Sequence, residues 1–239
     1  MDDKIRKLKD YIAASSNIVF FGGAGVSTES GIPDFRSTDG LFKTPYKHPP
    51  EVMLSHSFFM SQTSEFYRFY RDRMIYTDAK PNPAHTALAE LEYAGKLKVI
   101  ITQNIDGLHQ VAGSTNVIEL HGSVHRNFCM SCNESHPLEF ILCAEDIPLC
   151  ACGGIVKPDV VLYEEGLDEG AIDDSIRYIS QADMLIIGGT SLLVYPAAGL
   201  VRYYRGDRLV VINKSETHVD RRADLAINGS IGEVLGQCL

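Results

Sequence analysis

The sequence predicts an α/β protein with a parallel β-sheet, helices on both faces of the sheet, and a small cysteine-rich insert. Two observations predict this fold class. Segments of helical periodicity alternate with short strands that are apolar throughout, which is typical of a parallel sheet covered on both faces. A glycine-rich turn follows the first of these strands, as in folds that bind ligands at the carboxyl ends of their strands.

The first two elements are a helix and a buried strand. Ile5, Leu8 and Ile12 have helical spacing, which predicts a helix near the N-terminus. The apolar run "NIVFF" at 17–21 then predicts a strand, which ends in the turn "GGAG".

The alternation of helix and strand recurs three more times. Asn82 as N-cap, Pro83 at the first helical position and Gly95 after the last turn delimit a second helix, and the strand "LKVIIT" follows it. Later in the chain, "DEGAIDDSIRYISQ" precedes "DMLIIGGT" and "PAAGLVRYYR" precedes "LVVIN". Each of these pairs predicts a helix followed by a strand.

Two segments interrupt this pattern. Residues 31–50 are rich in proline, glycine and polar residues, which predicts a long loop, and such loops in compact domains are usually functional. Residues 128–157 carry two cysteine pairs and are too short to fold without a cross-link or a metal.

Composition narrows the functional classes. With 239 residues, 45% hydrophobic and 22% charged, the chain suits one large globular domain and not a disordered protein. Its formal charge of −9 repels phosphate backbones, so no direct nucleic-acid binding is expected and a lysine-rich peptide is a better partner. The segment "MDDKIRKLKD" lacks the apolar core of a signal peptide and no apolar run spans a bilayer, so we expect a cytoplasmic protein with no membrane partner.

Four cysteines form two close pairs, Cys129 with Cys132 and Cys150 with Cys152, separated by seventeen residues. Four thiolates from two tight turns match a structural Zn²⁺ site, one per chain, in which protein atoms fill all four positions. Such a saturated site cannot activate water, so its expected role is to fold the insert.

The turn "GGAGVSTESG" has features of a dinucleotide-binding loop. Its glycines let the backbone approach a pyrophosphate near a helix N-terminus. The fingerprint is imperfect, because Thr28 stands where a third glycine is expected and no acidic residue ends a second strand about twenty residues later. An ordinary hydride-transfer dehydrogenase is therefore disfavoured, although a dinucleotide is not.

Polar side chains follow the predicted strand ends in "TQNIDGLHQVAGSTNVIELHGSVH". Gln103, Asn104 and Asp106 come directly after one strand, and His121 ends the next. Open parallel sheets bind ligands at these ends, and a histidine there is a candidate general base because its pKa lies near neutrality.

These motifs together resemble the sirtuins, NAD-dependent protein-lysine deacylases. The matches run in order through "GAGVSTESGIPDFR", "TQNIDGLH", "HGS", the four cysteines, "KPDVVLYEE", "GTSLLVYPAA" and "VIN". The resemblance is to the compact bacterial or archaeal sirtuins and covers nearly the whole chain. It implies a Rossmann-like sheet. It implies one catalytic domain at 1–239, with a Rossmann-like part at 1–30, 80–127 and 158–239, a cofactor-binding loop and helical segment at 31–79, and a zinc-binding insert at 128–157.

The resemblance also implies which residues bind NAD as co-substrate. The glycine turn would hold the pyrophosphate, a distant strand would supply Asn213 to the adenine-side ribose, and Ile32 with Asp106 would form the nicotinamide pocket. The full implied set is Gly23, Ala24, Gly25, Thr28, Ile32, Asp34, Phe35, Arg36, Gln103, Asn104, Ile105, Asp106, His121, Gly189, Thr190, Ser191, Asn213, Lys214, Ser215 and Ile231.

The implied reaction passes the acyl group of a modified lysine to ADP-ribose and releases nicotinamide. His121 would act as general base on a ribose hydroxyl, while Gln103 and Asn104 would position ribose and water. Acyl-lysine proteins or peptides are the implied partners.

The segment "KPDVVLYEE" resembles the strand that pairs with the substrate backbone, and Val160, Val161 and Tyr163 would wall the acyl-lysine channel. Sirtuins commonly have Phe-Gly-Glu where this chain has Tyr163-Glu164-Glu165, and the added carboxylate would favour basic residues beside the target lysine.

Three alternative functions remain open. Tyr70 and Arg73 resemble the Tyr-x-x-Arg pair that holds succinyl or malonyl carboxylates in some sirtuins, although neighbouring arginines also fit a solvated basic helix face. A mono-ADP-ribosyltransferase would use the same pocket. A non-catalytic NAD-sensing module would bind NAD without releasing nicotinamide.

Overall fold

A parallel sheet forms the larger part of the computed structural model, which describes residues 2–35, 40 and 47–238. Its six strands have the order β3-β2-β1-β7-β8-β9, and every neighbouring pair is parallel. The strands are β1 (Ile18–Gly22), β2 (Leu97–Thr102), β3 (Val117–Glu119), β7 (Met184–Gly188), β8 (Leu209–Asn213) and β9 (Leu225–Asn228). The predicted α/β class is confirmed.

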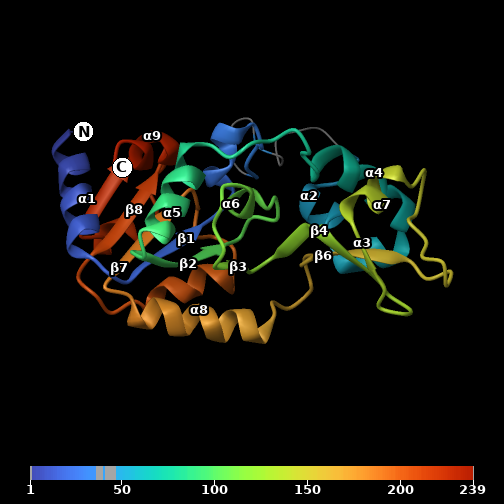
Figure 1. The fold of residues 1–239 in the computed structure, drawn as a ribbon. Helices are drawn as coiled ribbons and strands as arrows, with labels where there is room; N and C mark the ends of the chain where they lie inside the picture. The colour runs from blue at the N-terminus through green and yellow to red at the C-terminus, as the bar shows by residue number, and fades with distance from the viewer. Residues whose placement is uncertain (1, 36–39, 41–46, 239) are drawn as a thin grey trace.

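Helices cover both faces of this sheet (Figure 1). Alternate residues of β1 face opposite ways: Phe20 packs with the apolar residues of one face and Phe21 with those of the other. The first face is covered by α1 (Asp2–Ala14), α5 (Pro83–Tyr93) and α9 (Ile231–Gly236), and the second by α8 (Glu169–Gln181) and the 3₁₀ segment η4 (Ala197–Tyr203).

The local sequence accounts for where these helices begin. Asn82 caps α5 with its side-chain oxygen, and its amide group also donates to the Val26 carbonyl over 2.7 Å, which ties the helix to the glycine-rich turn. Asp168 caps α8. The segment "PAAGLVRYYR" is a 3₁₀ helix and not the α-helix that its pattern suggests; its interior Gly199 disfavours regular α-helix.

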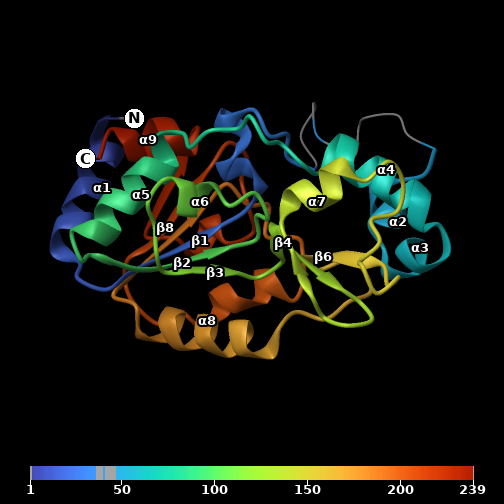
Figure 2. The ribbon, with the colours of Figure 1, turned by 45° about the vertical axis from the view of Figure 1, so that its right-hand side comes forward.

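A second body lies at one end of the sheet (Figure 2). It consists of the sheet β5-β4-β6, with β4 (Gly122–Cys129), β5 (Ser135–His136) and β6 (Val156–Val160), and the helices α2 (Pro50–Met53), α3 (His56–Ser61), α4 (Thr63–Arg73) and α7 (Leu138–Cys143). Apolar residues of α2, α3 and α4 share one core with the cysteine-rich segment. Segments from 50–73 and 122–160 therefore fold onto each other.

The remaining short segments connect the sheet to the site. They are η1 (Ala24–Val26), η2 (Thr28–Ser30), α6 (Leu108–Val111) and η5 (Asp220–Arg222). None of the helices that the structure describes has the length and apolar character needed to cross a lipid bilayer.

Candidate active site and metal centre

A cavity of about 1150 Å³ lies at the carboxyl ends of the parallel strands. The chain leaves β1 toward β2 and β3 on one side, whereas β7, β8 and β9 extend the sheet on the other. Ligands bind at such topological switch points. Every described residue that the sequence assigned to the cofactor or the substrate lines this cavity except Tyr70; Arg36 lies outside the described residues.

Two glycine turns interlock at the base of the cavity. Gly25 N donates to the Gly189 carbonyl over 2.7 Å. A Cβ atom at Gly25 would lie 2.8 Å from Gly189 Cα, and Gly189 itself has φ +59°. Only glycine tolerates both the close approach and the left-handed conformation, so these turns form a bare backbone cradle of the kind that holds phosphates.

Asn213 has a buried side-chain donor that forms no hydrogen bond with any described residue. Its Oδ1 accepts from Thr190 N at 3.0 Å. Its Nδ2 is buried and has no hydrogen-bond partner among the described residues, although the residue lines the cavity. A buried donor without a partner is costly, so this group fits a ligand oxygen such as a ribose hydroxyl. With the glycine cradle, the residues present fit NAD.

A polar network follows the end of β2. The Ser27 hydroxyl donates to Asp106 Oδ2 over 2.6 Å and accepts from Asn104 Nδ2 at 3.0 Å. Asp106 Oδ1 accepts from Leu108 N at 2.9 Å. Both oxygens of this carboxylate are thus held, which fixes its direction in the cavity.

His121 is oriented as a base. Its Nδ1 lies 2.9 Å from the Gln103 carbonyl, and because a carbonyl only accepts, Nδ1 carries the proton. Nε2 then keeps its lone pair, on a residue that lines the cavity. Burial lowers the pKa of His121, opposed by that hydrogen bond, so the imidazole is neutral at pH 7 and able to accept a proton.

His109, from the same stretch of sequence, cannot play that role. It is buried to 1% exposure, and burial together with neighbouring His85 lowers its pKa to about 3. The two imidazoles pack with centroids 4.8 Å apart. His109 is therefore a neutral core residue.

Residues of the second body form the opposite wall of the cavity. Val160, Val161, Tyr163 and Arg73 all line it. Tyr70 does not: it is fully buried and stacks on Phe66 with centroids 5.5 Å apart. The structure thus brings Arg73 to the cavity but leaves Tyr70 in the core.

The four predicted zinc ligands converge in the second body. All four Sγ atoms lie within 4.8 Å of one another, with Cys129 to Cys152 at 3.4 Å, Cys132 to Cys152 at 3.5 Å and Cys132 to Cys150 at 3.7 Å. Tetrahedral Zn²⁺ with Zn–S bonds of about 2.3 Å places its sulfurs about 3.8 Å apart. The donor set fits a structural zinc ion.

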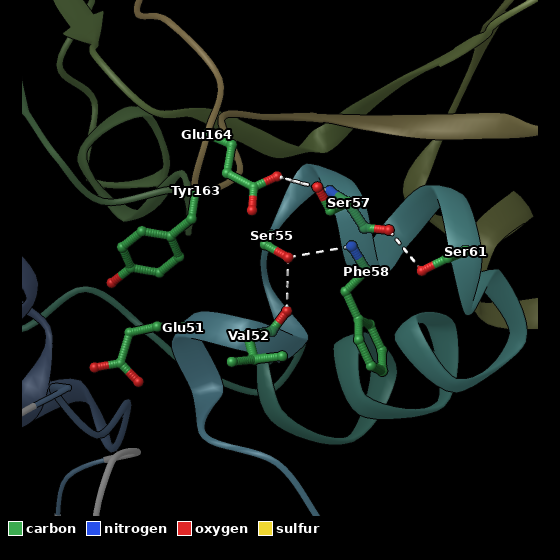
Figure 3. Close-up of a pocket in the computed structure, with 8 residues that line it drawn as sticks. All are labelled: Glu51, Val52, Ser55, Ser57, Phe58, Ser61, Tyr163 and Glu164. Atoms are coloured by element: carbon green, nitrogen blue, oxygen red, sulfur yellow. Dashed lines mark hydrogen bonds between the residues drawn. The ribbon is translucent and has the colours of Figure 1, made fainter.

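A smaller hollow of about 420 Å³ adjoins the cavity and shares Tyr163 and Glu164 with it. Figure 3 shows Tyr163 between Glu51 and Glu164, and Val52 and Phe58 also line the hollow. Glu164 has φ +77°, the conformation that suits a glycine. Its carboxylate accepts from Ser57 N at 2.9 Å and from Ser57 Oγ at 2.6 Å.

Two further polar residues of the cavity, Ser27 and His125, received no role from the sequence. Ser27 lies within the quoted glycine motif and His125 two residues after "HGS". A hydroxyl or an imidazole in a loop is usually solvated, and only the fold shows that both contact Asp106.

Comparison with known proteins gives concordant matches. The sequence model of the Sir2 family matches residues 23–196. A Clostridium acetobutylicum protein named NAD-dependent protein deacetylase is 64% identical over 237 residues, 98% of this chain and 97% of the relative. A structure solved for the mechanism and regulation of Sir2 enzymes has a TM-score of 0.90 and 42% identity, covering 100% of this chain and 97% of that one. A structure of Sir2 with a p53 peptide and NAD⁺ has a TM-score of 0.85 and 40% identity, covering 97% and 95%.

Proposed function

The chain belongs to the Sir2 family, and on this basis we propose that it is an NAD-dependent protein deacetylase. It transfers the acetyl group of an acetylated lysine to ADP-ribose and releases nicotinamide. The observation that carries this proposal is His121, whose Nδ1 is held by the Gln103 carbonyl at 2.9 Å while the residue lines the same cavity as the glycine cradle. A neutral base thus stands beside a dinucleotide-sized site.

The residues of the chain bind NAD, orient the reacting groups and accept a proton. Bound NAD supplies an electrophilic ribose carbon with nicotinamide as the leaving group. The glycine cradle holds the pyrophosphate, and Asn213 Nδ2 donates to the ribose on the adenine side. Ile32 and Asp106 hold the nicotinamide, and the neutral amides of Gln103 and Asn104 orient ribose and water. His121 Nε2 accepts the proton of a ribose hydroxyl.

The peptide enters from the second body. Val160, Val161 and Tyr163 line the cavity and flank the acetyl-lysine side chain, and the residues after β6 pair with the peptide backbone. Holding both reactants in one orientation supplies much of the rate. The Sir2 complex with a p53 peptide and NAD⁺ supports this arrangement.

The hollow beside Tyr163 favours a basic residue next to the target lysine. Val52 and Phe58 give it apolar surface, and neither Glu51 nor Glu164 forms a salt bridge with any described residue. The hydrogen bonds from Ser57 lower the pKa of Glu164, which keeps it charged. A lysine or arginine would pack its aliphatic stem against this apolar surface with its charged end at the carboxylates.

Paired peptides test this preference. The kcat/KM ratio for peptides with arginine or alanine beside the acetyl-lysine is measured for the wild type, Glu51→Gln and Glu164→Gln. Each substitution should lower the ratio by about two- to fivefold, as for an exposed ion pair. A ratio that stays at the wild-type value in both variants would refute the preference.

Acetyl is the preferred acyl group, ahead of succinyl or malonyl. Arg73 lines the cavity, but its Nε donates to Asp72 Oδ2 over 2.7 Å. Tyr70 OH is buried without a hydrogen-bond partner among the described residues and does not reach the cavity surface. A carboxylate on the acyl chain would meet an arginine whose charge Asp72 already offsets in part, without the Tyr70 hydroxyl beside it.

The activity is tested by product masses. The zinc-loaded protein is incubated with NAD and matched acetyl-lysine and succinyl-lysine peptides, and nicotinamide, acyl-ADP-ribose and peptide are followed by mass spectrometry. We expect acetyl-ADP-ribose with a peptide lighter by one acetyl group, and slower succinyl removal. A peptide heavier by ADP-ribose would indicate a transferase, and NAD binding without nicotinamide release would indicate a sensor.

A further inference from the structure

We propose that His125 is a positioning residue that fixes the Asp106–Gly107 peptide of the nicotinamide pocket and thereby strengthens NAD binding. This inference rests on the nicotinamide-pocket role proposed above for Asp106. It adds to that pocket a side chain from β4, an element of the second body.

A hydrogen bond joins His125 to the pocket. Its Nε2 lies 3.0 Å from the Asp106 carbonyl, and since a carbonyl only accepts, Nε2 carries the proton and donates. The preceding residue makes a parallel contact: Val124 N donates to the Ile105 carbonyl over 3.0 Å. The start of β4 thus holds two successive carbonyls of the segment after β2, one through main chain and one through the imidazole.

Gly107 leaves the space that the imidazole occupies. A Cβ atom at this position would lie 2.8 Å from His125 Cδ2 and 2.9 Å from its Nε2. Gly107 also has φ +73°, which glycine adopts at little cost. The ring therefore lies directly over the backbone of Gly107.

The same contact opposes a specific motion. Glycine's conformational freedom lets the peptide unit between Asp106 and Gly107 rotate, and this rotation would turn the Asp106 carbonyl away from His125. Its carboxylate is already held by Ser27 Oγ at 2.6 Å and Leu108 N at 2.9 Å. The imidazole holds the remaining oxygen, so all three oxygens of Asp106 are fixed before a ligand arrives.

His125 is placed to act on binding rather than on folding. It lines the cavity and is exposed, outside the apolar clusters that form the cores. Removing it should leave the packing intact. Without His125, the ligand must order the backbone of the pocket when it binds. The conformational entropy lost in this ordering weakens binding.

Affinity for NAD and for ADP-ribose, which lacks nicotinamide, tests the proposal. Both dissociation constants are measured by calorimetry on the zinc-loaded protein for wild type, His125→Ala and His125→Gln. In His125→Ala, the Kd for NAD should rise about three- to tenfold, as for loss of one hydrogen bond, while the Kd for ADP-ribose changes less than twofold. His125→Gln, whose amide N–H can donate to the same carbonyl, should recover most of the affinity for NAD.

The neighbouring strand residue provides a matched control. Arg126 is also exposed on β4 but does not line the cavity, so Arg126→Ala should bind NAD with wild-type affinity. An unchanged Kd for NAD in His125→Ala, or a glutamine variant as weak as the alanine variant, would overturn the proposal. Equal weakening for NAD and ADP-ribose would do the same, because it would locate the effect outside the nicotinamide pocket.

Failure of the proposed function remains distinguishable from failure of this inference. If the wild-type protein binds NAD but releases no nicotinamide, the enzyme assignment fails while the calorimetric comparison still decides the role of His125. If the wild type turns over and His125→Ala binds NAD normally, only the role of His125 fails.

Discussion

Ser27 connects two of the polar side chains after β2 through one hydroxyl. It donates to Asp106 at 2.6 Å and accepts from Asn104 at 3.0 Å. Ser27→Ala removes both bonds and leaves the carboxylate with one fewer donor. Because hydrogen bonds to charged groups contribute about 1.5–3 kcal/mol, we expect kcat/KM for NAD to fall about ten- to a hundredfold. Steady-state kinetics measure this, with Ser27→Thr as the control that keeps the hydroxyl; a wild-type kcat/KM in Ser27→Ala would contradict the network.

The pKa of His121 sets the acid side of the activity profile. Burial lowers that pKa below its ordinary value of about 6.5, so the base remains unprotonated into mildly acidic solution. On the acid side of the pH profile, the midpoint of the decline in kcat/KM should therefore lie below pH 6.5. A limb at or above pH 7, in a profile measured with constant ionic strength, would show that another group limits the reaction.

The sequence alone identifies many residues of the cavity but not the contacts between them. Gln103, Asn104 and Asp106 were found because polar residues at the ends of parallel strands meet at one edge of a sheet. Ser27 and His125 were not, because their role depends on a distance across the fold. The resemblance of Tyr70 and Arg73 to a Tyr-x-x-Arg pair could not indicate that the Tyr70 ring is fully buried, because burial depends on the packing of the surrounding helices.

We expect the cysteine-rich element to depend on a bound zinc ion. Its core is shared with α2, α3 and α4, and these helices lie next to the substrate wall, so loss of zinc should damage both folding and the peptide site. Cys150→Ser should abolish stoichiometric zinc and lower the yield of soluble protein. Metal analysis of the purified variant checks this, with Cys143→Ser, an exposed cysteine outside the cluster, as the control. Full zinc content in Cys150→Ser would exclude the assigned ligand set.

Local sequence signals predict the elements of the sheet better than they predict the second body. Continuous apolar runs, Asn82 with Pro83, and the glycine turn each suffice to place a strand, a helix start or a turn. The packing of 50–73 on 122–160 leaves no such signal, because it depends on contacts between segments far apart in the chain. Likewise, "PAAGLVRYYR" has helical periodicity but forms a 3₁₀ segment beside Pro196.

For the whole molecule, buried neutral histidines make stability depend on pH. In the folded state the pKa of His109 is about 3, whereas an unfolded chain protonates histidine below about 6.5. The unfolded state therefore binds more protons, and the free energy of unfolding should fall as pH drops from 6.5 toward 3, by at most about 1.4 kcal/mol per pH unit from this residue.

Denaturant unfolding at several pH values checks this. His109→Asn should reduce the change in the free energy of unfolding with pH. His218→Asn, which removes an exposed histidine, should leave this pH dependence unchanged. A wild-type slope in His109→Asn would show that other groups carry the acid sensitivity.

The most direct test of the central claim separates the two halves of the reaction in His121→Ala. Release of nicotinamide does not need the base, whereas transfer of the acetyl group to the ribose does. Exchange of labelled nicotinamide into NAD, with acetyl-lysine peptide present, should persist within about tenfold of wild type, and acetyl-ADP-ribose formation should fall by about 10²–10⁴. Acetyl-ADP-ribose formation within tenfold of wild type in a fully zinc-loaded variant would contradict the assignment of His121 as the base of an NAD-dependent deacetylase.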